Sequence, residues 1–245
     1  MVPYSRGFFG YGFRLNANET VLKTEITLTN GGTQYLYHWR DGNGVRHTFA
    51  EDSDDFYCDE DGLGAELCTT GNDSLEIKSA DGTVRTFSRI TLGGYVLTKI
   101  TDTSGNQLLF TCDDAGKITA VEKLYNGEKN SVTCFTLSYS SNRLSSIYDP
   151  VAKTSYTFNY TGNYMTGILY RHSSGNNSVT SLSEYQYTSS GYLISARDGL
   201  SQSKVQYDWT SKRVSAATEY AGNGNAGQKC GFTYGDHYSE ARSSG

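Results

Sequence analysis

The chain has 245 residues and a formal net charge of −5 at pH 7. This acidic balance argues against a nucleic-acid partner, because phosphate recognition depends on clustered Lys and Arg. Membrane insertion is not expected either, since spanning a bilayer takes about 20 consecutive apolar residues and the sequence has no such run. An aromatic content of 13% and only 2 prolines favour an all-β fold, because aromatic residues suit half-buried strands and proline interrupts strand pairing.

The N-terminal third is predicted to form hairpins of irregular spacing. Residues 35–39 precede the turn Asp41–Gly44, and residues 75–78 precede Asp81-Gly82. Asp-Gly and Asn-Gly turns between alternating segments are strong hairpin signals. We expect an N-terminal cap over residues 1–34, because the end units of repeat arrays are often atypical.

Two histidines flank the first of these turns. His38 and His47 can meet across the Asp41–Gly44 hairpin and, with a nearby acid, bind a metal or relay a proton. No third ligand is fixed by the spacing, so the preferred interpretation is two polar residues on the solvated face of a hairpin.

An acidic segment follows at residues 51–62. Its close-spaced oxygens suit Ca²⁺, which makes Asp54, Asp55, Asp59 and Asp61 the candidate ligands. The ligand order of an EF-hand is not met, and runs of like charge are usually exposed. We therefore prefer a solvated acidic loop without a metal.

The chain has 5 cysteines, so at least one is unpaired within it. Cys58 and Cys68 flank a short loop and can form a disulfide if the protein matures outside the cytosol. No CxxC pair suggests a zinc site, and no cofactor is expected.

From residue 97 onward a short apolar pair recurs after each aromatic-rich segment. Successive pairs start 21 to 28 residues apart, which is typical of an array of one supersecondary unit. The pairs are Leu97/Ile100, Ile118/Val121, Leu144/Ile147, Met165/Ile168, Leu193/Ala196 and Val214/Ala217.

Each of these units is predicted to be a β-hairpin. In residues 156–160 aromatic and polar residues alternate, residues 161–163 supply a turn, and Met165 begins the return strand. The apolar pair of the return strand should pack with the aromatics of the outgoing strand. Cys112 occupies an aromatic position of its hairpin, which favours a small buried side chain over a nucleophile.

The repeated pattern resembles the RHS/YD-repeat family. The resemblance rests on Tyr207-Asp208 followed by residues 213–219, on residues 142–149 and on residues 97–106, and it covers about residues 8 to 235. It implies a curved or spiralling strip of antiparallel hairpins, part of an RHS/YD-type shell. Self-cleavage is not implied, because the family's core segment is absent and Asp149-Pro150 lacks its context.

The resemblance also implies a function and a location. Members of the family are bacterial polymorphic toxins and related surface proteins, whose shell encloses a C-terminal cargo. We therefore expect a non-catalytic structural module of a larger secreted or cell-surface protein, with the rest of that protein or an enclosed cargo as its partner. The chain is expected to be a single repeat domain, with divergent hairpins over residues 35–95, regular repeats over residues 96–235 and a tail over residues 236–245.

Carbohydrate or cell-surface binding is the alternative function. Exposed aromatic rows on a sheet can stack against sugar rings, and Tyr160, Tyr187, Tyr207 and Trp209 are the candidate residues. If these side chains are buried, this alternative loses its main support. An open array also has unpaired edges, so edge-to-edge self-association is expected.

Overall fold

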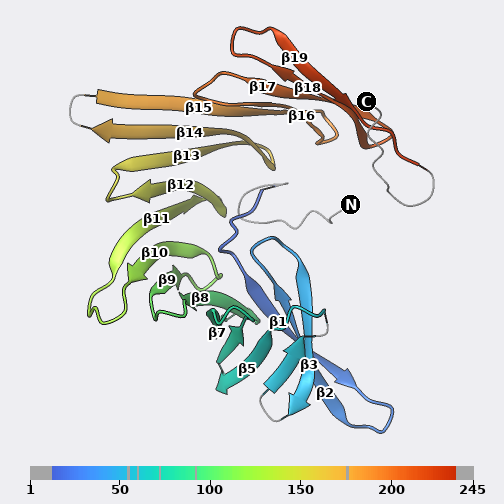
Figure 1. Ribbon diagram of the computed structural model, residues 1–245, viewed down its shortest axis with the longest axis vertical. Helices are drawn as coiled ribbons and strands as arrows, with labels where there is room; N and C mark the ends of the chain where they lie inside the picture. The colour runs from blue at the N-terminus through green and yellow to red at the C-terminus, as the bar shows by residue number, and fades with distance from the viewer. Residues whose placement is uncertain are drawn as a thin grey trace. The chain divides into compact units, whose positions relative to one another are not determined.

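The computed structural model describes residues 13–53, 56–59, 61–71, 73–91, 93–174 and 177–235 (Figure 1). These residues contain nineteen strands, and neighbouring strands pair in antiparallel fashion, which confirms the predicted all-β fold. No helix long and apolar enough to cross a membrane occurs in this part of the chain.

The chain divides into two compact units, which we describe separately. The N-terminal unit contains residues 14–138 and 148–151. The C-terminal unit contains Phe13, residues 139–147 and the described residues from 152 onward.

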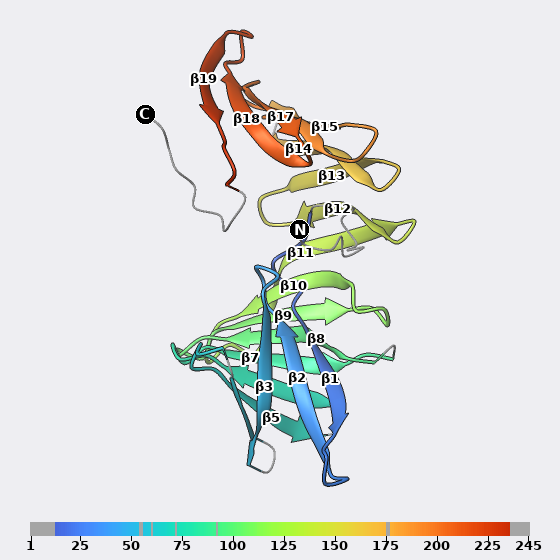
Figure 2. The ribbon, with the colours of Figure 1, turned by 90° about the vertical axis from the view of Figure 1, so that its right-hand side faces the viewer.

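The first eight strands of the N-terminal unit form a closed ring. Each strand pairs with the next, and β1 also pairs with β8, where Val21 lies opposite Tyr95 and Thr20 opposite Val96 (Figure 2). The ring strands are β1 (Thr20–Thr27), β2 (Thr33–Arg40), β3 (Arg46–Ser53), β4 (Phe56–Asp59), β5 (Glu66–Gly71), β6 (Ser74–Lys78), β7 (Val84–Arg89) and β8 (Tyr95–Thr101).

Apolar side chains from the ring strands fill its core. Strand alternation sends every second side chain inward, so Leu75 and Ile77 of β6 are both fully buried. Phe49 and Phe87 are also fully buried, and truncating such a ring to Ala typically costs about 3–5 kcal/mol. The ring is therefore a packed core rather than a channel.

Closure of the ring corrects one expectation from the sequence. The edge of β1 that an open array would leave unpaired is joined at Thr20 and Val21 to the first two residues of β8. The last residues of β8, Lys99–Thr101, pair on the same side with β9 (Gln107–Cys112). The array continues from this branch point through β10 (Ile118–Leu124) and β11 (Val132–Ser140).

The C-terminal unit is a run of antiparallel hairpins. Strands β13 to β19 pair in sequence order. The strands are β12 (Arg143–Asp149), β13 (Thr154–Thr161), β14 (Tyr164–Ser174), β15 (Asn177–Tyr187), β16 (Leu193–Arg197), β17 (Lys204–Thr210), β18 (Arg213–Tyr220) and β19 (Ala226–Gly231).

One turn geometry recurs in both units. In the Asp41–Gly44 turn, the amide of Gly44 donates to the Asp41 carbonyl, the amide of Asp41 donates to the Val45 carbonyl, and Gly44 has a φ of +87°. This is a tight turn completed by a glycine bulge, and only glycine adopts that φ without strain. The same bonds close the turns Ser79–Gly82, Asp102–Gly105, Asp113–Gly116, Thr188–Gly191 and Ala221–Gly224.

Aspartate at the first turn position has a structural role. Oδ2 of Asp102 accepts a hydrogen bond from the Asn106 side chain, and Oδ1 accepts bonds from the amides of Asn106 and Ser104; these bonds, the side-chain bond most of all, hold the pKa of Asp102 below its usual range. Asp113 accepts the equivalent bonds from amides in its own turn. These carboxylates cap turns, as Asx-turn geometry allows.

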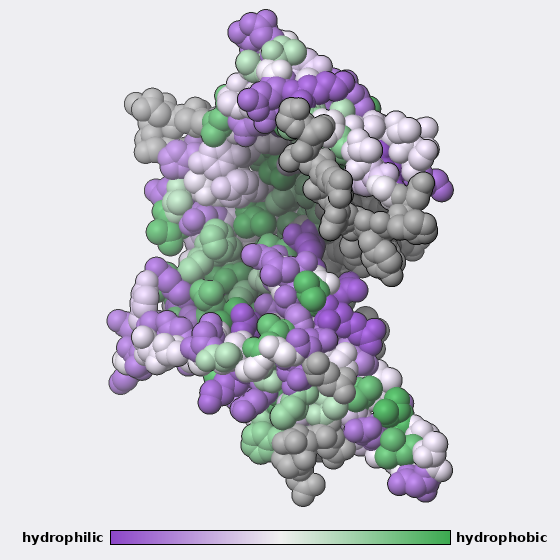
Figure 3. Space-filling view, turned by 45° about the vertical axis from the view of Figure 1, so that its right-hand side comes forward, coloured by the Kyte–Doolittle hydropathy of each residue, from purple (hydrophilic) through white to green (hydrophobic). Residues whose placement is uncertain are grey.

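The surface of each unit mixes hydrophilic and hydrophobic side chains (Figure 3). Val151 and Leu200, for example, are each 71% exposed at turns. Scattered apolar residues of this kind are normal on soluble folds and do not by themselves mark a site.

Candidate functional site

A repeated hydrogen bond joins successive hairpins of the C-terminal unit. The Tyr160 hydroxyl donates to the carbonyl of Leu144 at 2.8 Å, and the Tyr187 hydroxyl donates to the carbonyl of Met165 at 2.9 Å. Trp209 Nε1 donates to Leu193 at 2.8 Å, and the Tyr234 hydroxyl to Val214 at 2.9 Å. In every case the acceptor is the first member of the apolar pair in an earlier hairpin. We call these contacts the inter-hairpin bonds.

A β-bulge places each donor correctly for its bond. Tyr160 lies opposite Met165, Tyr187 opposite Leu193 and Trp209 opposite Val214, and the strand register shifts immediately before each aromatic residue. Bulges increase local twist and redirect a side chain. Each aromatic residue therefore pairs with the apolar residue of its own hairpin and bonds to that of an earlier one, which confirms the predicted packing of pairs with aromatics.

The N-terminal unit contains a weaker version of the same contact. Cys112 lies opposite Ile118, and its thiol donates to the carbonyl of Leu97 at 3.8 Å. Burial, with a smaller contribution from Asp113, raises the pKa of the Cys112 thiol to about 11. The thiol is therefore protonated at neutral pH and is not an activated nucleophile. Cys112 instead occupies the position that an aromatic residue takes in the other hairpins.

Burial also marks the bonded tyrosines. Desolvation raises the pKa of Tyr160 and of Tyr187 to about 12 in each case. Of the four candidate sugar-stacking residues, Tyr160, Tyr187 and Trp209 are half-buried with their polar atoms bonded to backbone, and Tyr207 is half-buried opposite Ala217. These positions favour a structural role for the aromatic rows, and sugar binding by them stays a prediction.

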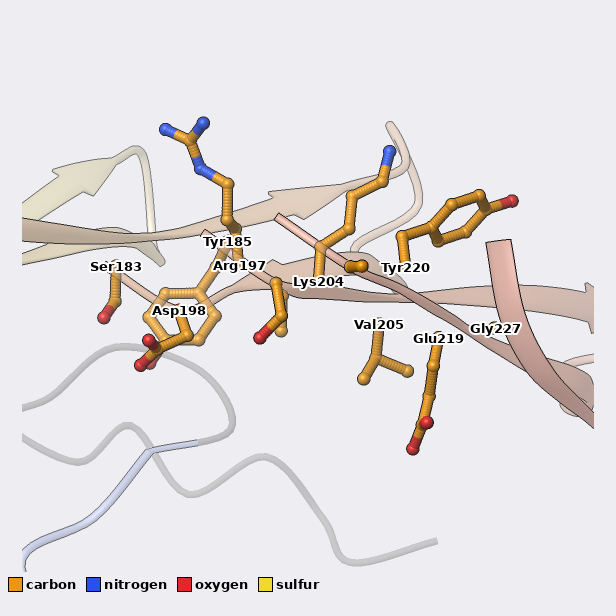
Figure 4. Close-up of a pocket in the computed structure, with 12 residues that line it drawn as sticks. Ser183, Tyr185, Arg197, Asp198, Lys204, Val205, Glu219, Tyr220 and Gly227 are labelled. Atoms are coloured by element: carbon orange, nitrogen blue, oxygen red, sulfur yellow. The ribbon is translucent and has the colours of Figure 1, made fainter. Parts of the chain in front are cut away.

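A cavity of about 640 Å³ lies over strands β15 to β18 of the C-terminal unit (Figure 4). Among its lining residues, the cross-strand row Tyr185, Ala196, Val205 and Glu219 lies on one face of the sheet, and Arg197, Lys204 and Tyr220 of the next row point to the other. Its other lining residues are Ser183, Asp198, Ser203, Ala221 and Gly227.

Most polar groups around this cavity already have partners. Asp198 accepts hydrogen bonds from the amide and the hydroxyl of Ser201 and from the amide of Leu200, which hold its pKa below the usual range. Arg197 forms an ion pair with Glu184, and the Lys204 ammonium lies 4.6 Å from the centre of the Tyr220 ring.

A second polar cluster lies at one end of the N-terminal ring. His47 Nε2 is 3.4 Å from Asp41 Oδ2, and His47 Nδ1 is 3.6 Å from Asp61 Oδ2. Asp59 completes the cluster, because one ligand atom from each of His47, Asp59 and Asp61 lies within 4.8 Å of the other two. The sequence interpretation missed this cluster because it placed residues 51–62 in a loop, whereas β3 and β4 pair and bring the turn after β4 beside His47.

The alternative in which the two histidines meet does not occur, and the preferred interpretation of two solvated histidines is wrong for His47, which is 7% exposed. His38 lies opposite Thr48 and its Nδ1 is 3.3 Å from Thr48 Oγ1, whereas His47 lies opposite Trp39. Adjacent positions of a strand point to opposite faces, so the two imidazoles cannot meet. Among the proposed calcium ligands, Asp59 and Asp61 come together, and Asp54 and Asp55 lie outside the described residues.

A buried carboxylate lies beside this cluster. Glu19 is 6% exposed, accepts a hydrogen bond from Trp39 Nε1 at 2.8 Å and lies 3.5 Å from Arg85 Nε. Burial raises the pKa of Glu19, and the Arg85 charge opposes that rise. The Glu19 charge is thus compensated by an ion pair with Arg85 and a hydrogen bond from Trp39, which is how buried charges are normally accommodated.

No disulfide joins any of the five cysteines, all of which lie in the described residues. Cys58 lies opposite Glu66 and Cys68 opposite Phe56, so the two cysteines occupy diagonal rather than facing positions of the β4–β5 pair.

Known proteins resemble the chain only distantly. No protein-family model and no curated protein sequence matches it. The match to a structure described as TcdB2-TccC3-TEV covers 90% of this chain and 15% of the matched chain, with 12% sequence identity and a TM-score of 0.48. The Tc holotoxin pore of Photorhabdus luminescens covers 89% of this chain and 14% of its own, at 11% identity and a TM-score of 0.28.

A porin-like protein from Bacteroides uniformis covers 92% of this chain and 97% of its own, at 13% identity and a TM-score of 0.36. The chain spans about 15% of the length of the first toxin structure.

Proposed function

We propose that the chain is a non-catalytic structural module that forms part of a wall in a larger secreted or surface protein of the RHS/YD type. The inter-hairpin bonds carry this proposal. They commit the polar atoms of Tyr160, Tyr187 and Trp209 to backbone carbonyls of other hairpins, so these aromatics serve to hold the array together. The partner would be a cargo or another segment of the same protein.

The exposed edge of the C-terminal unit supports the same proposal. Every residue of β19 is exposed, and Tyr234 makes an inter-hairpin bond although 46% of its surface is accessible. This edge offers backbone groups and an aromatic contact to which a further hairpin could add.

The test is limited proteolysis of the parent protein that contains this chain. We expect its enclosed segment to resist cleavage, and to become sensitive at lower denaturant concentration in the variant Tyr160→Phe, Tyr187→Phe, Trp209→Phe. Each change keeps a ring and removes one inter-hairpin bond, which is worth about 1 kcal/mol. Tyr148→Phe is the matched control, because Tyr148 is 43% exposed. The proposal would be contradicted if the enclosed segment were cleaved at the same denaturant concentration in the unmodified parent, the triple variant and the Tyr148→Phe control.

Carbohydrate binding remains the second candidate, and the cavity over β15 to β18 is the observation that favours it. Tyr185 offers a ring and Glu219 an acceptor beside about 640 Å³ of space. A glycan array probed with the intact chain tests this candidate. Binding abolished by Tyr185→Leu but retained in Tyr187→Phe would support the cavity as a sugar site, and no binding to any glycan would exclude it.

A further inference from the structure

We propose that His47, Asp59 and Asp61 form a binding site for a divalent transition metal of the zinc type, with Asp41 orienting the histidine. The site lies at one end of the N-terminal ring and is independent of the structural role proposed above. Its ligands come from two segments, strand β3 for His47 and the end of β4 with the following turn for the two aspartates.

The buried imidazole is the first observation behind this proposal. The His47 side chain is 9% exposed, and its Nδ1 has no hydrogen-bond partner in the described structure. A buried polar atom without a partner costs free energy and requires an explanation. Here the orphan nitrogen faces carboxylate oxygens.

The other ring nitrogen is held as metal sites require. His47 Nε2 lies 3.4 Å from Asp41 Oδ2, while Asp41 Oδ1 accepts hydrogen bonds from the amides of Asn43 and Val45, which fix the carboxylate. When the hydrogen of the neutral imidazole is on Nε2 and is donated to Asp41 in a hydrogen bond, Nδ1 carries no hydrogen, and its lone pair is available to a metal. This carboxylate-histidine arrangement is the usual support of a metal-binding imidazole.

The aspartates are equally well fixed. Asp59 accepts hydrogen bonds from the backbone amides of Asp61 and Leu63, and Asp61 Oδ2 accepts one from Thr48 at 3.0 Å. Each oxygen keeps a second lone pair for a cation. The carboxylates therefore need no large rearrangement to serve as ligands.

Ligand chemistry and spacing select the metal class. Zinc bonds of about 2.0–2.1 Å in a tetrahedron separate neighbouring ligand atoms by about 3.3 Å, and His47 Nδ1 is 3.6 Å from Asp61 Oδ2. Ca²⁺ prefers six or more oxygens, so the imidazole favours a transition metal instead. Asp61 is 47% exposed, which leaves a fourth position open to water.

The competing arrangement is a protonated imidazole that bridges Asp41 and Asp61 without a metal. Co²⁺ distinguishes the two, because four-coordinate Co²⁺ absorbs visible light and Zn²⁺ displaces it. The titration uses the full chain under reducing conditions with Cys58→Ser and Cys230→Ser, since both thiols are exposed and would otherwise bind the metal.

We expect one equivalent of Co²⁺ to bind with four-coordinate absorption. Asp61→Asn should weaken binding at least about ten-fold, and Asp41→Asn by about 10–100-fold, as loss of a supporting carboxylate does. Asp102→Asn is the matched control for Asp41→Asn, because Asp102 caps the same kind of turn with no histidine beside it. Circular dichroism checks that every variant is folded.

The absence of saturable Co²⁺ binding by the folded chain would overturn the proposal. Equal affinity in the Asp61→Asn, Asp41→Asn and Asp102→Asn variants would overturn it as well, since the metal would then lie elsewhere.

Discussion

At the scale of single residues, the aromatic side chains both pack through their rings and form hydrogen bonds through their polar atoms, and the sequence predicts only the packing. Alternation in residues 156–160 predicts one buried aromatic face, but a bulge interrupts it before Tyr160, which is half-buried, and Tyr156 is 37% exposed. The sequence cannot show where the Tyr160 hydroxyl goes, because its acceptor is a backbone carbonyl 16 residues away that carries no residue-type signature. Polar partners of this kind become visible only when neighbouring hairpins are placed.

His47 illustrates the same limit. The sequence marks it as one of two histidines beside a turn, and its neighbours Asp59 and Asp61 lie at the end of the paired strand β4 and in the turn after it. The acidic segment was predicted to be a solvated loop, but residues 51–53 and 56–59 are strand and Tyr57 is only 6% exposed. The β3–β4 pairing, which that prediction missed, brings the Asp61 carboxylate to the imidazole.

The bonded tyrosines predict a pH dependence of stability. The pKa of Tyr160 and of Tyr187 is raised to about 12 from the ordinary value of 10. Between pH 10 and 12 the unfolded chain releases these protons while the folded chain retains them, so stability is complete below pH 10 and falls as the pH rises through this window. Urea unfolding at increasing pH should show a falling midpoint.

Ultraviolet absorbance of tyrosinate provides the direct measurement. We expect a late-titrating fraction, and Tyr187→Phe should reduce it by one residue. Simultaneous titration of all tyrosines would show that burial does not hold these protons.

At the scale of elements, the hairpins follow sequence signals closely and some of their turns do not. Asp-Gly and Asn-Gly turns were predicted where they occur, because glycine at positive φ is a local requirement. The β17–β18 turn has no glycine, and Ser211 and Lys212 adopt φ values of 50° and 66°. Strand pairing on either side imposes this conformation on residues that do not prefer it.

This strain predicts that Lys212→Gly stabilises the chain. The left-handed conformation destabilises the folded state by about 1–2 kcal/mol for a residue with a Cβ, and glycine avoids this cost. The greater conformational entropy of glycine in the unfolded chain offsets part of the resulting stabilisation. We expect the free energy of unfolding to rise by about 0.5–1 kcal/mol, measured by urea denaturation. Lys129→Gly is the control, since Lys129 is an exposed loop residue without positive φ. A less stable Lys212→Gly protein would mean that the lysine side chain makes a contribution larger than the strain.

At the scale of the whole molecule, repetition was predictable and closure was not. The apolar pairs predict hairpins in series, since each pair and its aromatic residue lie close together in sequence. Pairing of Val21 with Tyr95 joins residues more than 70 positions apart, and no local pattern encodes it. The ring therefore depends on twist accumulated over eight strands, which sequence periodicity does not report.

The exposed edge of the C-terminal unit predicts self-association. Strand β19 is fully exposed, and an unblocked edge strand is a template for another chain. Sedimentation velocity under reducing conditions should show dimers or larger species that increase with protein concentration. Gln228→Lys should weaken this association, because a lysine on an edge strand must be desolvated when a second edge approaches.

The matched control is Gln206→Lys, which adds the same charge to an exposed position of β17, a strand paired on both sides by β16 and β18. If association proceeds through β19, this variant should sediment like the parent chain, because its lysine is remote from the free backbone groups of the edge. Equal weakening by both variants would indicate that net charge rather than edge pairing controls association. A parent chain that stays monomeric at high concentration would show that β19 is protected by its own twist.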